Sequence, residues 1–119
     1  MEVKWIEYKG KKILYVEYRG AQNEDEMLKI LHEFAGILRE SKDKILSIGD
    51  FTDTFASDGF MKELKKLGKE ILNAKTEKGA LLGISGIKKI FYRAYLRFTG
   101  VTNLALFETV DQANEWLIK

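Results

Sequence analysis

The feature that most constrains this sequence is the change of hydrophobic period along the chain. Apolar and polar residues alternate in EVKWIEY (2–8), and a second apolar run follows in KKILYVEYRG (11–20). The two runs are separated by Lys9 and Gly10, which indicates two strands joined as a hairpin. Beyond them the period lengthens to that of a helix, shortens again, and repeats this exchange to the end of the chain. Such a pattern restricts the fold to a sheet with helices packed against it.

Three more strands and four helices follow from the same pattern. The predicted buried strands are KILSIGD (44–50), KGALLGIS (78–85) and NLALFE (103–108). The predicted apolar helix faces are Met27, Ile30, Leu31, Phe34, Ile37 and Leu38; Phe60, Leu64, Leu67 and Ile71; Ile87, Ile90, Phe91, Ala94, Tyr95 and Phe98; and Val110, Ala113, Trp116 and Leu117. Asn23 and Thr109 are typical of helix starts, and Gly100 of a helix end. The predicted order is β-β-α-β-α-β-α-β-α.

This order predicts one α/β domain over residues 1–119. Strands that alternate with helices need crossover connections, so the sheet should be mainly parallel, with flanking helices and an antiparallel hairpin at its N-terminal edge. A chain of 119 residues is long enough to bury a core of its own.

Composition excludes several kinds of site. The chain has no cysteine and one histidine, which excludes disulfides, thiolate nucleophiles and metal sites built from those residues. The net charge of +2 arises from 20 basic and 18 acidic residues interspersed along the chain, so nothing favours a nucleic-acid partner. The N-terminus lacks the pattern of a secretion signal, and no apolar run is long enough to span a membrane. We expect a soluble, cytoplasmic protein without a cofactor.

Polar residues follow several of the predicted strands. Arg19, Asp50, Ser85 with Gly86, and Glu108 lie at or just past strand ends. Ligands of open α/β sheets bind beyond the carboxyl ends of parallel strands. We therefore expect these residues to share one rim of the sheet.

The loop GDFTDTFASDGF (49–60) admits two interpretations. Asp50 and Asp53 resemble an acidic loop that holds magnesium and takes part in phosphoryl transfer or hydrolysis, but the spacing is Asp-x-x-Asp and no lysine lies near the last strand. Aspartates also form turns that lead into helices, and this interpretation is favoured. GISG (83–86) likewise suggests either a phosphate cradle or a tight turn, and it lacks a complete phosphate-binding motif.

Apolar residues exceed what one helix face requires in IFYRAYLRF (90–98). Tyr92 and Leu96 lie one turn apart, opposite the face predicted to bury Ile87, Ile90 and Phe91. Together with the aromatic neighbours Phe91 and Tyr95, they suggest a surface for a partner or an apolar ligand. An isolated exposed pair is the alternative.

Four segments resemble SpoIIAA-like proteins, small relatives of the sulfate-transporter and anti-sigma-factor-antagonist (STAS) domain. They are YVEYRG, GDFTDT, GISGIKKIFYRAYLRFTG and LFETVDQANEWL, and they occur in the order seen in that family. The resemblance spans essentially the whole chain. It implies a non-enzymatic module that binds protein partners or small ligands.

The resemblance also bears on regulation and on ligands. Anti-sigma-factor antagonists carry Asp-Ser-Ser-Gly, whose second serine is phosphorylated, where this chain has Ala56-Ser57-Asp58-Gly59. Asp58 thus occupies the phosphoacceptor position and Ser57 a helix-cap position, so we expect no phosphoserine switch. The family is related in fold to CRAL-TRIO lipid-binding domains, which implies an apolar ligand near residues 87–98 as the alternative function. Because small domains cover spare apolar surface in symmetric pairs, a homodimer is also expected.

Overall fold

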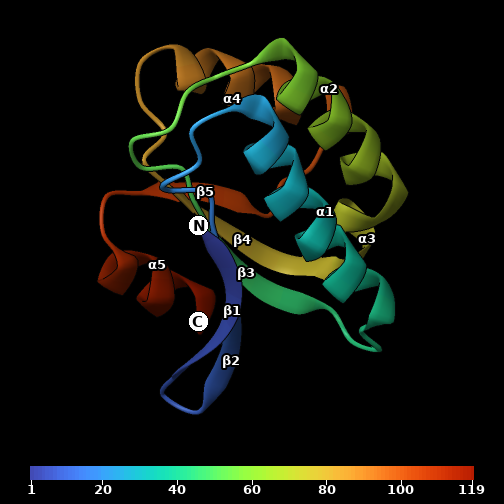
Figure 1. Ribbon diagram of the computed structural model, residues 1–119. Coiled ribbons are helices and arrows are strands. Elements are labelled where there is room, and N and C mark those ends of the chain that lie inside the picture. The colour runs from blue at the N-terminus through green and yellow to red at the C-terminus, as the bar shows by residue number, and fades with distance from the viewer.

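A computed structural model describes residues 1–119 and confirms the predicted α/β class and element order (Figure 1). The elements are, in chain order, β1 (Glu2–Tyr8), β2 (Lys11–Glu17), α1 (Glu24–Glu40), β3 (Ile45–Asp50), α2 (Asp58–Leu67), the π-helical turn η1 (Gly68–Leu72), α3 (Asn73–Lys75), β4 (Thr76–Leu82), α4 (Ile87–Thr99), β5 (Leu104–Phe107) and α5 (Val110–Leu117). The second predicted helix corresponds to α2, η1 and α3, which follow one another without a break. None of the helices has both the length and the apolar character needed to cross a membrane.

The five strands form one sheet in the order β1-β2-β3-β4-β5. β1 and β2 are antiparallel, and every other neighbouring pair is parallel, as predicted. Lys9 and Gly10 both have positive φ, 50° and 82°, which is the conformation of a two-residue hairpin turn that matches strand twist. The hairpin therefore pairs Tyr8 directly with Lys11.

Helices cover both faces of the sheet. In Figure 1, α1, α2 and α4 lie on one side of the sheet and α5 lies on the other. Alternate residues of β2 face the two layers: Leu14 and Val16 belong to the larger core beneath α1 and α2, and Ile13 and Tyr15 to the smaller core beneath α5. Because side chains alternate across a strand, one buried strand serves both layers.

The predicted helix ends are confirmed. The Asn23 side chain accepts the Glu26 N–H at 2.9 Å, and Thr109 Oγ1 accepts the Gln112 N–H at 3.1 Å. Gly100 ends α4 with φ 71°, the left-handed conformation that favours glycine at this position. These contacts connect residues close in sequence, which explains why local patterns predict them.

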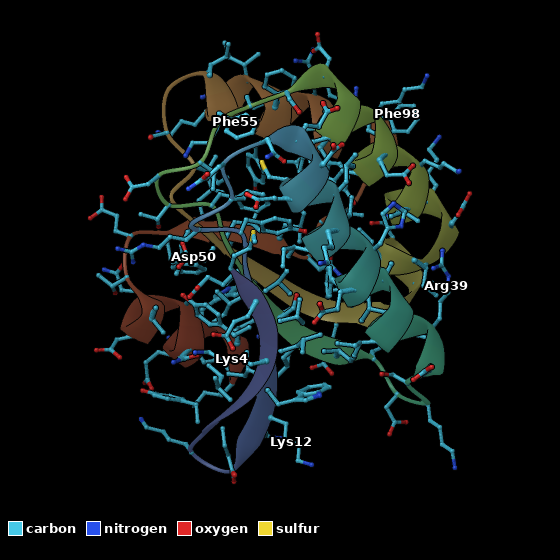
Figure 2. All side chains as sticks on the ribbon, viewed as in Figure 1. Lys4, Lys12, Arg39, Asp50, Phe55 and Phe98 are labelled. Atoms are coloured by element: carbon cyan, nitrogen blue, oxygen red, sulfur yellow. The ribbon has the colours of Figure 1, made fainter.

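The orientation of α4 differs from the prediction. Ile87, Ile90 and Phe98 were expected to be buried, but their exposed fractions are 62%, 63% and 48%, and Figure 2 shows Phe98 at the outer surface. Tyr95, which was predicted on the same face, is buried as expected. The helix carries two apolar arcs, one with Ile87 and Ile90 and the other with Tyr92 and Tyr95. The arc with the tyrosines faces inward because glycine stands opposite Tyr95. A carbon added as Cβ at Gly68 would lie only 2.4 Å from the Tyr95 hydroxyl oxygen, so Tyr95 fits only against a glycine.

Candidate ligand-binding cavity

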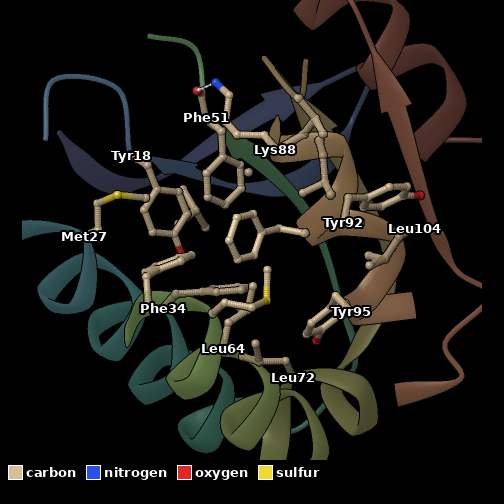
Figure 3. A pocket seen from close by; sticks show the side chains of 18 of the residues that line it. Tyr18, Met27, Phe34, Phe51, Leu64, Leu72, Lys88, Tyr92, Tyr95 and Leu104 are labelled. Carbon is tan, nitrogen blue, oxygen red and sulfur yellow. Dashed lines mark hydrogen bonds between the residues drawn. The ribbon is translucent and has the colours of Figure 1, made fainter. Parts of the chain in front are cut away.

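A mostly apolar cavity of about 130 Å³ lies between the sheet and the helices α2 and α4 (Figure 3). Its floor is formed by the larger-core side of β3, β4 and β5. Its walls come from the loop after β3, from α2, and from α4. Figure 3 shows side chains from these separate elements pointing toward a common centre. The cavity thus depends on how the layers pack and not on any one segment.

The floor is hollow because the central strands carry small residues there. Ser47 and Gly49 of β3 and Gly79 of β4 line the cavity. A Cβ on Gly79 would lie 2.6 Å from Leu104 Cδ2, and one on Gly49 would lie 3.0 Å from Leu81 Cδ2. Leucines of the neighbouring strands therefore pack over the two glycines, and no side chain at these positions of β3 and β4 fills the centre of the cavity.

An aromatic cluster forms one wall. The Tyr18 and Phe51 rings stack with centroids 4.4 Å apart and an interplanar angle of 12°. Phe60 meets Tyr18 edge-on at 5.4 Å and 82°. Stacked and edge-to-face arrangements are the favourable ones for aromatic pairs. This wall is preformed and presents ring surface to whatever occupies the cavity.

Two tyrosine hydroxyls supply polar atoms to the lining. Tyr18 is only 2% exposed, and its hydroxyl makes no hydrogen bond with the protein. Burial, and to a smaller extent the neighbouring Tyr95, raises the pKa of Tyr18. The Tyr95 hydroxyl donates to Asn73 Oδ1 at 3.3 Å, and burial raises the pKa of Tyr95 to about 12. Both phenols are therefore neutral at physiological pH.

Lys88 is the one charged residue in the cavity lining. Its ammonium group donates to the Phe51 carbonyl oxygen at 2.9 Å (Figure 3). No carboxylate forms an ion pair with it. An ammonium group has three donors, so Lys88 has donors to spare beside an apolar space.

A second hollow, of about 480 Å³, lies between α2 and α4 on the outer side. Lysines from α2 and the exposed apolar residues of α4 surround it, and Lys69 Nζ lies 4.1 Å from the Phe98 ring centroid. Met61 and Phe91 line both this groove and the inner cavity. These two side chains therefore separate the cavity from the surface.

The four residues predicted near this helix divide between two environments. Phe91, Tyr92 and Tyr95 line the cavity, whereas Leu96 does not. Tyr92 is half-buried and does not form an exposed patch with Leu96. The exposed apolar arc of α4 is the one with Ile87 and Ile90, and not the predicted pair of Tyr92 and Leu96.

The residues of the predicted strand-end rim are not joined in one hydrogen-bond network. The Asp50 carbonyl oxygen accepts the N–H groups of Tyr18 and Arg19 at 3.0 and 3.2 Å, which joins Arg19 and Asp50. No hydrogen bond or ion pair links either residue to Ser85 or Glu108. Glu108 instead donates its N–H to the Gln112 side chain at the start of α5.

Asp50 serves the interior. It is 4% exposed; its Oδ2 accepts the Tyr15 hydroxyl at 2.6 Å, and its Oδ1 accepts the Thr52 N–H at 3.0 Å. Burial opposes the charged form, but the hydrogen bonds from Thr52 and Tyr15 outweigh it and lower the pKa of Asp50. Asp53 lies in the following turn with φ 57°. Both Asp50 oxygens are thus engaged within the protein, which supports the turn interpretation of this loop.

GISG forms a tight turn. Gly83 has φ +75°, and a Cβ there would lie 2.4 Å from the Thr52 backbone nitrogen. β4 therefore ends at Leu82 and not at residue 85 as predicted. The carbonyls of Ser85 and Gly86 accept the N–H groups of Lys88 and Lys89, which starts α4.

The start of α2 joins two helices. Ser57 Oγ accepts the Phe60 N–H at 3.2 Å, so the predicted cap is confirmed. The same hydroxyl donates to Glu24 Oε1 at 2.8 Å. Asp58 opens the helix, and Gly59 lies so close that a Cβ there would be 2.3 Å from Glu24 Oε1. Sequence reasoning missed Glu24 because it lies 33 residues away from Ser57.

Sequence reasoning also missed four residues of the cavity lining, namely Tyr18, Gly49, Gly79 and Lys88. Glycine inside an apolar strand was the available signal, since such a residue marks a close approach or an unfilled space. Nothing in the sequence distinguishes Tyr18 and Lys88 from other aromatic residues and lysines. Their place in the cavity lining follows only from the folded structure.

Comparisons with known proteins provide evidence on the fold. No family model matches the chain, and no curated protein matches it. A solved structure is similar, with a TM-score of 0.73 and 18% sequence identity over 97% of this chain and 91% of the other. It is an uncharacterised protein of the DUF3478 family from Shewanella loihica PV-4, described as having a SpoIIAA-like fold. The arrangement of strands and helices and this likeness together show that the chain has a SpoIIAA-like fold.

Proposed function

We propose that this protein is a non-enzymatic binding module that holds a small apolar ligand between the sheet and α4. The observation that carries the proposal is the cavity of about 130 Å³. Native interiors are close-packed and contain few voids larger than a water molecule. An apolar lining with a few polar groups is typical of small-molecule sites, and an apolar cavity of roughly 150 Å³ in another protein takes up benzene. A SpoIIAA-like fold is compatible with a regulatory module, and ligand binding would supply its signal.

The position of the cavity adds support. Residues from β3, β4, α2 and α4 all line it, so an occupant would contact both layers at once. Binding to the folded state alone stabilises that state. It would also change the packing of Met61 and Phe91, which border the outer groove. Occupancy would in this way be sensed at the surface between α2 and α4.

The test is whether small apolar molecules stabilise the protein. We expect toluene, indole and benzyl alcohol to raise the melting temperature in a concentration-dependent way. Native mass spectrometry of protein purified from cells would identify a retained molecule. The blocking variant is Ser47→Val, which adds side-chain volume to the cavity floor, and Ser85→Val is the matched control at an exposed position. If no compound stabilises the wild type and nothing co-purifies, the proposal is wrong.

A second candidate function, interaction with a protein or with another copy of the chain, is favoured by the outer arc of α4. Ile87, Ile90 and Phe98 are exposed large apolar residues on one helix. In this proposal they form the dimer surface in place of the predicted Tyr92 and Leu96 pair. Ile87→Glu combined with Ile90→Lys should convert a dimer to a monomer in light scattering. A wild type that is monomeric at high concentration would exclude self-association.

We further propose that the start of α2 has no phosphoserine switch. Ser57 Oγ lies 2.8 Å from the Glu24 carboxylate. A phosphate on Ser57 would add nearly two negative charges beside it, which like-charge repulsion disfavours. Intact-mass analysis of protein from its native cells should show no substantial phosphorylation at Ser57, and a phosphorylated fraction mapped there would contradict the proposal.

A further inference from the structure

We propose that the ligand is a small carboxylic acid with a single aromatic ring, whose carboxylate pairs with Lys88 and whose further polar substituent bonds to Tyr18. This inference rests on the proposed ligand-binding function and specifies its chemistry. It follows from three properties of the cavity: its size, its single charge, and its unpaired hydroxyl.

Size limits the ligand to about one ring. An apolar cavity of roughly 150 Å³ in another protein takes up benzene, and the cavity here is about 130 Å³. A long acyl chain would not fit within it. The aromatic wall of Tyr18, Phe51 and Phe60 offers faces and edges at the geometry that ring pairs prefer. A ring therefore suits this space better than a flexible chain of the same volume, because the chain would lose more rotational freedom on binding.

Charge favours an anion. Lys88 is the one charged residue of the lining, and no carboxylate of the protein pairs with it. Its bond to the Phe51 carbonyl uses one of its donors and fixes the ammonium group beside the aromatic wall. In Figure 3, Lys88 lies beside Phe51, while Leu72 and Tyr95 lie at the opposite end of the cavity. A carboxylate at Lys88 would keep its charge at one end and leave the ring among apolar side chains.

The second polar contact comes from Tyr18. A hydroxyl that is removed from bulk water and has no partner is costly. Asn114 Oδ1 is the one fully enclosed side-chain polar atom without a partner, so the unpaired Tyr18 hydroxyl keeps surface that is open to the cavity. A ligand hydroxyl or carbonyl oxygen would satisfy it. Since a phenol both donates and accepts, either kind of substituent can pair with it.

Matched ligands test the role of Lys88. Benzoate and benzyl alcohol share the ring and differ in charge. For the wild type, we expect calorimetry to give a Kd for benzoate that is at least about tenfold lower than the Kd for benzyl alcohol, because the carboxylate makes a charged hydrogen bond. Lys88→Met should abolish this preference, whereas Lys89→Met, the same change at the exposed neighbouring residue, should keep it. If Lys88→Met preserves the preference, Lys88 does not bind the carboxylate.

Hydroxylated ligands test the role of Tyr18. We expect 3- or 4-hydroxybenzoate to bind more tightly than benzoate, and we expect Tyr18→Phe to remove that gain while leaving benzoate binding within about twofold. Circular dichroism and thermal melts establish that each variant folds. A gain that persists in Tyr18→Phe overturns this part of the proposal.

The two proposals fail in distinguishable ways. If benzyl alcohol and toluene stabilise the protein as well as benzoate does, the cavity binds ligands but the carboxylic-acid inference is wrong. If none of the aromatic compounds binds, the ligand-binding function fails with it. Binding of decanoate in preference to benzoate would show that the cavity opens to take a chain, which also overturns the single-ring inference.

Discussion

Ser57 shows how one hydroxyl stabilises two helices. It caps α2 by accepting the Phe60 N–H and donates to Glu24 at the start of α1. Ser57→Ala should reduce the free energy of unfolding by about 1 kcal/mol or somewhat more, because the cap is lost and Glu24 loses a donor. Asp58→Ser should cost only about 0.3–1 kcal/mol, since it removes a favourable charge near the helix N-terminus. Urea denaturation measures both losses, and a larger loss for Asp58→Ser would contradict this account.

Asp50 and Tyr15 form a buried pair whose contribution depends on pH. Because hydrogen bonds hold the pKa of Asp50 below its usual value despite burial, ionised Asp50 stabilises the fold above its ordinary pKa near 4. That contribution is lost as the pH falls through the lower folded-state pKa. Tyr15→Phe should therefore cost about 1.5–3 kcal/mol at pH 7 and less at pH 3.

Tyr8 offers the matched control for this pair. Its hydroxyl bonds to Glu115 near the surface, so Tyr8→Phe should cost little at either pH. Chemical denaturation of both variants at the two pH values gives the comparison. An equal loss for Tyr15→Phe at pH 7 and pH 3 would show that the ring's packing matters and the bond to Asp50 does not.

At the scale of elements, the π-helical turn η1 determines how α2 meets α4. Gly68 begins this turn, and Tyr95 of α4 lies against it. A Cβ at Gly68 would be 2.4 Å from the Tyr95 hydroxyl oxygen and 3.1 Å from two ring carbons. Gly68→Ala should therefore destabilise the protein by about 1–3 kcal/mol, as overpacking does.

A double variant and a control sharpen this prediction. In the Tyr95→Phe background, Gly68→Ala should cost less, because the closest colliding atom is gone. Gly36→Ala in α1 should stabilise by about 0.5–1 kcal/mol, since a Cβ there meets nothing within 4 Å and alanine is the better helix former. If Gly68→Ala stabilises as Gly36→Ala does, the close contact with Tyr95 does not control the packing of α4.

At the scale of the whole molecule, the cavity is a place where the sheet and the helices lack the van der Waals contacts that a filled core would make. Ser47→Val places two methyl groups on the cavity floor, where the serine side chain makes no hydrogen bond. We expect the ligand-free protein to gain up to about 1–2 kcal/mol, because apolar groups enter apolar space. Thermal melts of Ser47→Val and Ser85→Val provide the measurement. A loss above about 1 kcal/mol for Ser47→Val alone would show that the floor has no room.

The sequence by itself determined the order of strands and helices, the hairpin, and the helix caps at Asn23, Ser57 and Thr109. Each of these depends on residues within a few positions of one another, such as the bond from Glu26 to Asn23. The spacing of apolar residues indicates which segments are strands and which are helices, and which face of each one is buried. Local chemistry is sufficient for these features, since the groups that make them lie close together in the sequence.

Only the tertiary structure decided which arc of α4 faces inward, that Asp50 is a buried hydrogen-bond acceptor, and that a cavity exists. α4 carries two apolar arcs. The one with the tyrosines faces inward because Gly68 makes room for Tyr95, and because Gly49 and Gly79 leave space in the sheet beneath the helix. A cavity is a property of side chains that are missing from several elements at once. No local pattern encodes it, because packing between layers depends on the volumes of residues far apart in the sequence.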